Sequence, residues 1–329
     1  MLRIGCLGAA RITPAAMILP AQKLSGVSVS AVASRDHYRA TAFAHQHDIE
    51  GIETDYEALI ARNDVDVVYN ALPPSRHEDL TIAALRAGKP VLCEKPFAMN
   101  GDAAKRMAET AEETGTLLME AFHYRFHPAF AVVQDALQRE ELGELQRVDA
   151  EFSVEIKEKP GELRHTYELG GGALMDLGCY PIHWARTLLE GEPRITSAKS
   201  IIGQPKIDLQ TEALMIFSGG VEARIRTNIQ TGATFAARLK LEGSDATLTM
   251  ENPLAPHFGY SIQIEGDGDP ITVASGTANT QTTYDYQLEH FVKCVRGEAE
   301  PLLSPWDAVA NMAAIDAIYR AAGLPPRPG

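Results

Sequence analysis

Cysteine is scarce in this sequence, and its four cysteines (Cys6, Cys93, Cys179 and Cys294) lie far apart without a CxxC pair. A disulfide-stapled domain and a cysteine-rich zinc site both need regularly spaced cysteines. The sequence therefore argues against both and predicts free thiols in a reducing cytosol. No metal site is expected.

Long apolar runs are also lacking. No uninterrupted stretch approaches the roughly 20 residues that a helix needs to cross a bilayer. The first residues lead directly into an apolar strand, without the basic region and apolar segment of an export signal. These absences predict a cytoplasmic protein that has no membrane partner.

Positive charge is outweighed by negative charge. Lys and Arg number 30 against 44 Asp and Glu, which gives a net charge of −14. Nucleic acids and anionic lipids attract cationic surfaces, so the sequence predicts neither as a partner. A small anion needs only a local positive site and is not excluded.

What the sequence does have is enough apolar material for two cores. Hydrophobic residues make up 45% of its 329 residues, and a single core rarely grows past about 250–300 residues. In residues 1–122, short apolar strands alternate with helices, which predicts a doubly wound parallel sheet. The predicted strands are 3–7, 27–33, 66–71, 90–93 and 117–121, and the predicted helices are 15–24, 37–46, 56–61, 78–87 and 103–113.

The pattern changes in residues 123–329, the second predicted domain. Consecutive strands with short connectors between 196 and 273 predict an open, mostly antiparallel or mixed sheet within an α/β domain. Helices are expected at 127–139, 173–189, 284–296 and 305–322, and the last of these can pack back on the first domain. Substrate specificity is expected in the loops 155–169 and 252–260.

The turn after the first predicted strand, Gly8 to Thr13, has the form of a dinucleotide-binding turn in which Ala10 and Thr13 replace two glycines. Such a turn presents backbone N–H groups and a helix N-terminus to a pyrophosphate. Taken alone, a plain strand-to-helix turn explains it equally well. At the tip of the second strand stand Ser34 and Arg35, with Arg39 one helical turn later. Because an acid would be expected there for NAD, this pattern favours NADP, unless Arg35 is merely a surface residue.

Two further segments suggest chemistry. Lys95 follows the fourth strand in Cys93-Glu94-Lys95-Pro96, and residues at this end of a parallel strand point toward the ligand crevice; the alternative is an exposed loop lysine. In the helix predicted after Gly170-Gly171-Gly172, Asp176 and Tyr180 are four residues apart and share a face. Glycines that allow close ligand approach would then precede a polar substrate pocket. The alternatives are a first-turn charge for Asp176, an interface aromatic for Tyr180 and a hydrogen-bonded core histidine for His183.

Together the Glu94-Lys95-Pro96 motif, the Gly8-x-Ala10 turn and Gly170-Gly171-Gly172-x3-Asp176-x3-Tyr180 resemble the glucose–fructose oxidoreductase / inositol dehydrogenase / MocA (Gfo/Idh/MocA) family. The chain is most similar to its dihydrodiol and NADP-dependent aldose dehydrogenase branch. The resemblance implies a Rossmann domain, NADP (or NAD) as cofactor, and Lys95, Tyr180 and Asp176 as catalytic residues. The predicted cofactor-binding residues are Gly8, Ala10, Arg11, Ile12, Ser34, Arg35, Arg39, Leu72, Pro73, His77, Glu94, Lys95 and Arg125.

This resemblance predicts hydride transfer between a nicotinamide and a CH–OH or carbonyl group of a sugar or cyclic diol. Tyr180 would move the proton and Lys95 would lower its pKa, although Lys95 could itself carry the proton. A non-catalytic NAD(P)-binding regulator and an NAD-dependent glycosidase are the alternative functions. A homodimer or a dimer of dimers is expected, because one face of the second sheet would otherwise lack a cover.

Overall fold

The computed structural model describes residues 1–203, 206–277 and 281–329. The backbone forms two compact units. Unit 1 contains residues 1–123, 284–309 and 329, and unit 2 contains residues 124–283 and 310–328.

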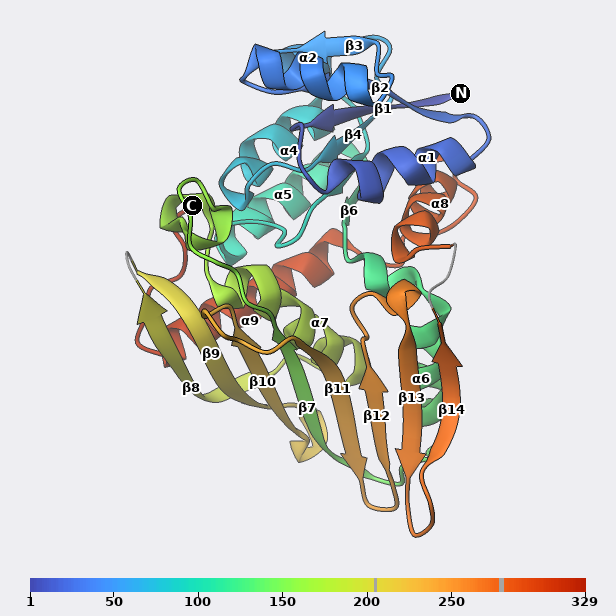
Figure 1. Cartoon of the computed structure of the whole chain (residues 1–329), viewed down its shortest axis with the longest axis vertical. Coiled ribbons are helices and arrows are strands. Elements are labelled where there is room, and N and C mark those ends of the chain that lie inside the picture. The colour runs from blue at the N-terminus through green and yellow to red at the C-terminus, as the bar shows by residue number, and fades with distance from the viewer. Residues whose placement is uncertain (204–205, 278–280) are drawn as a thin grey trace. The chain divides into compact units, whose positions relative to one another are not determined.

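Unit 1 is built on a six-stranded parallel sheet (Figure 1). Its strand order, β3-β2-β1-β4-β5-β6, reverses direction between β1 and β4, which is the topological switch point where ligands bind in doubly wound folds. The strands are β1 (Leu2–Leu7), β2 (Val27–Ala33), β3 (Gly51–Glu53), β4 (Val67–Asn70), β5 (Val91–Cys93) and β6 (Leu118–Glu120). The helices are α1 (Leu19–Lys23), α2 (His37–Gln46), α3 (Tyr56–Ala61), α4 (His77–Arg86), α5 (Gly101–Thr114) and, apart from its first residue, α8 (Thr283–Val295).

Side-chain caps explain where several of these helices begin. The Asp36 carboxylate accepts a hydrogen bond from Arg39 N at the start of α2, and Asn100 accepts one from Ala103 N at the start of α5. Such caps satisfy backbone donors that have no partner inside the helix. Helix α5 ends at Gly115, whose φ of 61° is readily adopted only by glycine.

The predicted doubly wound sheet is confirmed, and strand 27–33 and helices 37–46 and 56–61 have the predicted bounds. The helix predicted over 15–24 is present, but its first part is a π-helical turn (Pro14–Ile18) that precedes the short α1. The three-residue strand β3 was not predicted, since it is too short to show a periodicity.

Unit 2 contains an eight-stranded sheet in the order β14-β13-β12-β11-β7-β10-β9-β8. Among the described strands of this sheet, only β7 and β10 pair in parallel, so the predicted mixed, mostly antiparallel sheet is confirmed. The strands are β7 (Leu145–Ser153), β8 (Arg194–Gly203), β9 (Ile207–Ile216), β10 (Glu222–Asn228), β11 (Ala236–Gly243), β12 (Thr247–Glu251), β13 (Tyr260–Glu265) and β14 (Ile271–Gly276). The helices are α6 (Pro128–Gln138), a π-helical turn (Leu174–Gly178) continued by α7 (Cys179–Leu188), and α9 (Pro305–Ala321), which belongs to unit 2 from residue 310.

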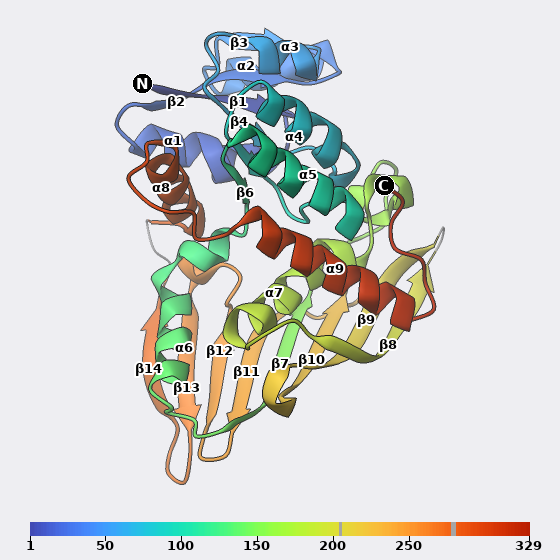
Figure 2. The same ribbon diagram turned by 180° about the vertical axis from the view of Figure 1, so that it is seen from behind.

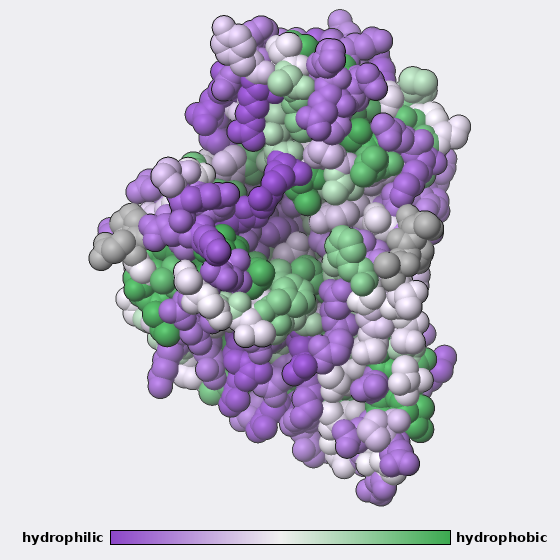
Figure 3. All heavy atoms as spheres, viewed as in Figure 1, coloured by the Kyte–Doolittle hydropathy of each residue, from purple (hydrophilic) through white to green (hydrophobic). Residues whose placement is uncertain are grey.

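Helices α6, α7 and α9 lie against one face of this sheet and leave the other face open (Figures 1 and 2). The apolar residues of β10 are on the helix side, because Ala223, Ile225 and Thr227 are at most 1% exposed. The open face instead carries ion pairs such as Arg226–Glu151 (3.2 Å), and Figure 3 shows mostly hydrophilic side chains over its centre. The apolar cover on which the dimer prediction relied is therefore supplied by the chain's own helices, and the homodimer stays a prediction.

Within the described residues, no helix is both long enough and apolar enough to cross a membrane. The four cysteines are free, and three of them are buried. Burial raises the pKa of the Cys6 thiol to about 12, so this group stays protonated at neutral pH.

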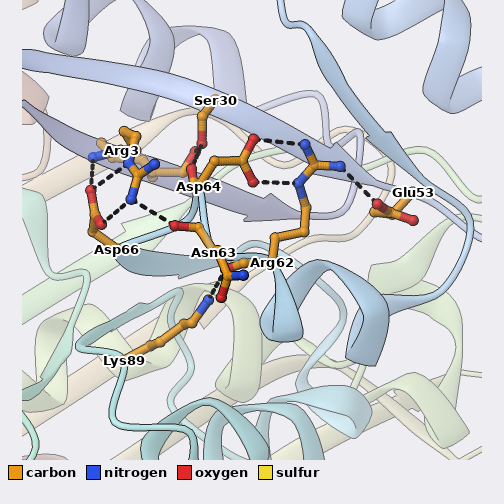
Figure 4. A network of polar contacts seen from close by, with 9 residues as sticks. Arg3, Ser30, Glu53, Arg62, Asn63, Asp64, Asp66 and Lys89 are labelled. Carbon is orange, nitrogen blue, oxygen red and sulfur yellow. Dashed lines mark hydrogen bonds and ion pairs between the residues drawn. The ribbon is translucent and has the colours of Figure 1, made fainter.

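A network of charges surrounds the connector between α3 and β4 (Figure 4). Arg62 donates to both oxygens of Asp64 at 2.7 and 2.8 Å and to Glu53 at 2.8 Å. Arg3 forms a second forked pair with Asp66, at 2.7 and 3.0 Å. These contacts tie the start of β1 and the end of β3 to the connector that leads into β4.

Replacing Arg62 with Gln should therefore lower the stability of unit 1 slightly at pH 7. The Arg62 guanidinium lowers the pKa of Asp64, and a carboxylate with a lowered pKa stabilises the fold above its ordinary pKa of about 4. That stabilisation disappears as the pH falls through the lowered value. The urea unfolding midpoints of the two proteins should thus differ at pH 7, and the difference should shrink as the pH falls below the ordinary carboxylate pKa, whereas Lys105→Gln, at a looser surface pair, should have almost no effect. A difference between wild type and Arg62→Gln that is independent of pH would contradict this explanation.

Candidate active site

The turn after β1 has the backbone geometry that a phosphate-binding turn requires. Gly8 has a φ of +97°, and a Cβ there would approach the Leu72 side chain to 3.1 Å. Gly8 N donates to Ala33 O (2.9 Å), which joins the ends of β1 and β2. Thr13, at the third glycine position, is fully buried before the π-helical turn. Thr13 N and Ala16 N donate to Ala10 O (3.1 Å) and Ile12 O (2.9 Å), and Pro14 has no N–H. Pyrophosphate binding by the turn that precedes them stays a prediction.

At the tip of β2 the donors suit a phosphate better than a ribose hydroxyl. Ser34 is buried and Arg35 is exposed. The nearby acid, Asp36, uses its carboxylate to cap α2, with Arg39 N at 3.1 Å. The Arg39 guanidinium donates to Ala9 O at 2.8 Å and so connects α2 to the turn after β1. A hydroxyl with two guanidiniums is the donor set that fits the 2′-phosphate of NADP.

His77 connects the loops that follow β4 and β5. Its Nε2 lies 2.7 Å from Leu72 O, and its Nδ1 lies 3.1 Å from Pro96 O and 3.2 Å from Phe97 O. The ring is fully buried, and this burial lowers the pKa of His77. Both ring nitrogens thus face backbone carbonyls, which fixes the loop containing Lys95; contact of His77 with a cofactor stays a prediction.

Tyr69, on the neighbouring strand β4, also holds the end of β5. The Tyr69 hydroxyl donates to Glu94 Oε1 at 2.7 Å, and burial together with the Glu94 charge raises the pKa of Tyr69 well above its usual value. The next residue, Lys95, is half-buried, and its peptide bond to Pro96 is cis. Lys95 therefore stands at the carboxyl edge of the sheet, next to the turns after β1 and β4.

In unit 2, Asp176 and Tyr180 lie on one continuous helical segment. Asp176 is in the π-helical turn and Tyr180 is in the first turn of α7, so the helix predicted over 173–189 is present, with a π-helical first turn. Four residues make close to a full turn in either helix type, which keeps both side chains on one side of the segment. Single π-helical turns inside helices occur frequently at functional sites.

Aromatic rings enclose Tyr180, which is 4% exposed. The ring centroids of Phe152 and Tyr124 lie 5.8 and 6.2 Å away in edge-on contacts, and that of Trp184 lies 6.4 Å away. Behind them, the Tyr124 hydroxyl lies 2.6 Å from His183 Nδ1. His183 is therefore a hydrogen-bonded core histidine, which confirms the simpler of its two interpretations.

The glycine-rich loop before Asp176 packs against the chain itself. A Cβ on Gly171 would lie 2.6–2.8 Å from three carbonyl oxygens of residues 163, 164 and 166. A Cβ on Gly172 would overlap Asp208 and Arg327, and its φ is +128°. Packing within the chain therefore accounts for Gly171 and Gly172, since protein atoms fill the space that a Cβ would occupy. Close approach of a ligand to this loop stays a prediction.

Asp208 and Arg327 form an ion pair of 2.5 Å in which neither side chain is more than 1% exposed. Asp208 also accepts from Leu174 N (2.7 Å), at the start of the π-helical turn, and from the Tyr319 hydroxyl (2.8 Å). Arg327 donates to Gly171 O at 2.8 Å, and its guanidinium lies 4.5 and 4.7 Å from the ring centroids of Tyr319 and Tyr167. This pair, to which we refer as the buried clamp, fixes the segment that leads into Asp176.

Arg125 and His127 have partners within unit 2. Arg125 donates to Gln134 on α6 (3.1 Å) and lies over the ring of Phe130, so its predicted cofactor contact remains untested. His127 caps α6 by accepting from Ala129 N. Burial, aided by the charge of His257, lowers the pKa of His127 to about 4, so it is neutral at pH 7. Over the residues that the structure describes, no group of His, Cys, Asp or Glu could hold a metal ion.

The patterns in the sequence did not indicate Arg164, Asp208 and Arg327 as residues that hold the candidate site. Arg164 Nε lies 3.2 Å from Asp176 Oδ2, inside the loop that was expected to determine specificity. Asp208 and Arg327 are 36 and 155 residues beyond Gly172, so no local spacing connects them to it.

Family models match most of the chain. One, described as an oxidoreductase family with an NAD-binding Rossmann fold, matches residues 2–122, and the GFO/IDH/MocA C-terminal domain matches residues 130–249. The chain belongs to the GFO/IDH/MocA oxidoreductase family. The resemblance seen in the sequence is thereby confirmed, as is the expectation of an enzyme with a nicotinamide dinucleotide cofactor.

Named relatives in the GFO/IDH/MocA family cover nearly the whole chain. D-xylose 1-dehydrogenase (NADP(+)) 2 of Haloferax volcanii is 31% identical over 97% of this chain and 96% of its own. Trans-1,2-dihydrobenzene-1,2-diol dehydrogenase of Xenopus laevis is 34% identical over 85% of each chain. A solved 3-ketoreductase from Actinomadura kijaniata, in complex with NADP and TDP-benzene, has a TM-score of 0.89 at 28% identity over 97% of both chains.

The buried clamp predicts a large effect on stability. Arg327→Met should cost about 3–5 kcal/mol, because it leaves the Asp208 carboxylate buried without its cation. Combining it with Asp208→Asn should recover much of that loss, since no unpaired charge then remains. Arg139→Gln, at an exposed pair of 3.8 Å with Glu141, is the surface control. Urea unfolding measures all three variants, and an Arg327→Met loss no larger than the Arg139→Gln loss would contradict the prediction.

Proposed function

We propose that this GFO/IDH/MocA protein is an NADP-dependent dehydrogenase or reductase that acts on a CH–OH or carbonyl group of a sugar or cyclic diol. The observation that carries the proposal is the Asp176–Tyr180 segment, where an acid and a phenol one turn apart begin a helix that is fixed by buried contacts. An acid can bind substrate hydroxyls, and a phenol can exchange a proton with a substrate oxygen.

The cofactor assignment depends on the tip of β2. Ser34, Arg35 and Arg39 would hold the 2′-phosphate, and the turn comprising Gly8, Ala10, Arg11 and Ile12 would hold the pyrophosphate. NADP, when bound, supplies or accepts the hydride. The relatives support this choice, since the names of the xylose dehydrogenase and of the ketoreductase complex both include NADP.

Proton transfer is assigned to Tyr180. In the direction of oxidation, the hydride leaves the carbinol carbon with its electron pair, the hydroxyl proton goes to the Tyr180 oxygen, and a C=O bond forms. A phenol with the usual pKa of about 10 is a poor base at neutral pH, so the Lys95 ammonium is assigned the roles of favouring the phenolate and donating to the substrate oxygen. Asp176 is assigned to a neighbouring substrate hydroxyl.

The relatives also support a lysine and a tyrosine as the reacting pair. Solved variants of the Actinomadura kijaniata ketoreductase include a tyrosine replaced by phenylalanine and a lysine replaced by alanine or glutamate. The named substrates of the relatives, a pentose, a dihydrodiol and a dTDP-linked deoxysugar, share a ring carbon that carries a hydroxyl or carbonyl. A homodimer, or a dimer of dimers, is proposed as the working assembly.

Arg35→Ala should weaken NADPH binding more than tenfold and leave NADH binding nearly unchanged. One charge-assisted hydrogen bond to a phosphate contributes roughly 1.5–3 kcal/mol, and NADH has no 2′-phosphate. Fluorescence titration of each cofactor measures the two dissociation constants. Equal losses for both cofactors would show that Arg35 does not read the 2′-phosphate.

Tyr180→Phe should lower kcat by about 10²–10⁴-fold, the usual contribution of a general acid or base, while the NADPH dissociation constant hardly changes. Lys95→Ala should be at least as damaging. Formation of NADPH from NADP, with a panel of D-xylose, D-glucose and trans-1,2-dihydrobenzene-1,2-diol as substrates, measures net turnover. Tyr56→Phe, at a buried tyrosine on α3, is the matched control.

Each outcome of these assays has a defined meaning. Near-normal turnover by Tyr180→Phe together with inactivity of Lys95→Ala would assign the proton to Lys95 instead. Tight NADPH binding without turnover of any panel member would favour the non-catalytic regulator, and glycoside cleavage without net NADPH formation would favour the glycosidase.

A further inference from the structure

We propose that Arg164 is a positioning residue for Asp176, holding the Asp176 carboxylate in the orientation that binds a substrate hydroxyl. The inference rests on the proposed function of Asp176. It assigns a role to a residue in the loop 155–169, from which substrate specificity was expected.

The Arg164 guanidinium divides its donors between two carboxylates. Its Nε lies 3.2 Å from Asp176 Oδ2, and its Nη1 lies 3.1 Å from Glu162 Oε1. Its side chain is 29% exposed, and those of Asp176 and Glu162 are 14% and 10% exposed. Partly buried ion pairs of this kind are screened less by solvent than surface pairs, so the contact can restrict the Asp176 side chain.

The backbone on both sides of this contact is fixed. Gly172 N donates to Arg164 O, and Gly171 N donates to Thr166 O, both at 2.9 Å. The buried clamp holds the same loop through Gly171 O and holds the π-helical turn through Leu174 N. Arg164 and Asp176 therefore start from backbone positions that cannot move apart without breaking buried hydrogen bonds.

A planar guanidinium is required for this geometry. It presents donors in a rigid fork, whereas a lysine ammonium is a point charge on a flexible stem. The Asp176 charge is the main cause that raises the pKa of Arg164, so the cation persists at every pH at which the enzyme would work. The fork can thus hold Asp176 on one side while Glu162 occupies another donor.

The competing explanation is that Arg164 only staples its loop to the helix. A staple would act on the fold whether or not residue 176 is an acid, whereas a positioning residue acts only through the Asp176 carboxylate. A double-mutant cycle separates the two, because it measures whether the effect of one substitution depends on the other.

The experiment compares Arg164→Gln in the unaltered protein and in the Asp176→Asn background. The readouts are kcat/KM for the best substrate among D-xylose, D-glucose and trans-1,2-dihydrobenzene-1,2-diol, the NADPH dissociation constant, and the urea unfolding midpoint. We expect Arg164→Gln to lower kcat/KM at least tenfold in the unaltered protein but less than twofold in the Asp176→Asn background. The NADPH dissociation constant should stay within twofold in both.

Two further variants serve as controls. Arg238→Gln removes an arginine that is more exposed than Arg164 (59% against 29%) from a surface pair with Glu251 on β11 and β12, and should change none of the kinetic readouts. Arg164→Lys keeps a cation beside Glu162 and replaces the glutamine variant if that variant does not fold; its loss should likewise vanish in the Asp176→Asn background.

An equal loss in both backgrounds, or a loss of NADPH affinity as large as the loss of kcat/KM, would overturn the role of Arg164. If Asp176→Asn alone leaves kcat/KM unchanged, the proposed role of Asp176 fails first, and the inference falls with it. If the unaltered protein turns over no panel member, the proposed function itself is contradicted, and with it the inference.

Discussion

The Asp208 carboxylate is shut off from water inside unit 2, and the segment that contains Asp176 and Tyr180 is arranged around it. A buried carboxylate needs donors on its oxygens, and here the backbone of Leu174, the Tyr319 hydroxyl and the Arg327 guanidinium supply them. Only a residue without a side chain fits at position 172 beside this pair. The π-helical turn therefore begins at Leu174, whose N–H group donates to the Asp208 carboxylate. This starting point determines in which direction the side chains of the following residues point.

In unit 1, a buried histidine fixes the loops at the edge of the sheet. In a parallel sheet, the loops that follow the carboxyl ends of the strands lie at one edge, but the topology alone does not fix the positions of these loops relative to one another. His77 does so by placing its two ring nitrogens against carbonyls of the loops after β4 and β5. Tyr69 adds a contact beneath Glu94. The backbone around Lys95 is thus set by buried hydrogen bonds, and its position does not depend on a bound ligand.

The sequence predicted those parts of the fold that local patterns determine. The strand 27–33 and the helices 37–46 and 56–61 have continuous hydrophobic patterns and side-chain caps, and their bounds were predicted correctly. The π-helical turns could not be predicted, because five residues are too few to distinguish their period from that of an α-helix. The open face of the second sheet was misjudged for another reason: alternation shows that two faces differ, but not which of them the chain's own helices cover.

Dependence on local patterns also explains which candidate site residues the sequence could indicate. Ser34, Lys95 and Asp176 follow strand ends or glycines, where a pattern along the chain indicates a position in space. The buried clamp joins residues that are more than a hundred positions apart, and the orientation of Arg164 depends on the short 3₁₀ turn Leu163–His165. Such residues are visible only once the backbone is in place. The residues that hold a reacting group are therefore harder to predict from sequence than the reacting group itself.

Charge adds a last constraint on how an anionic dinucleotide could be bound. With a net charge of −14, the long-range field of the chain repels anions, so attraction must come from groups in direct contact. In the proposed cofactor site, backbone N–H groups after Gly8 would supply part of it without adding any formal charge. Arg35 and Arg39 add formal charge only at the tip of β2, where the neighbouring acid, Asp36, already caps a helix. Salt screens both the long-range repulsion of the dinucleotide and its attraction to exposed arginines. The first effect of salt raises the affinity for the dinucleotide and the second lowers it. A chain of this composition can therefore bind an anionic dinucleotide through direct contacts at one edge of a sheet, although its long-range field is repulsive.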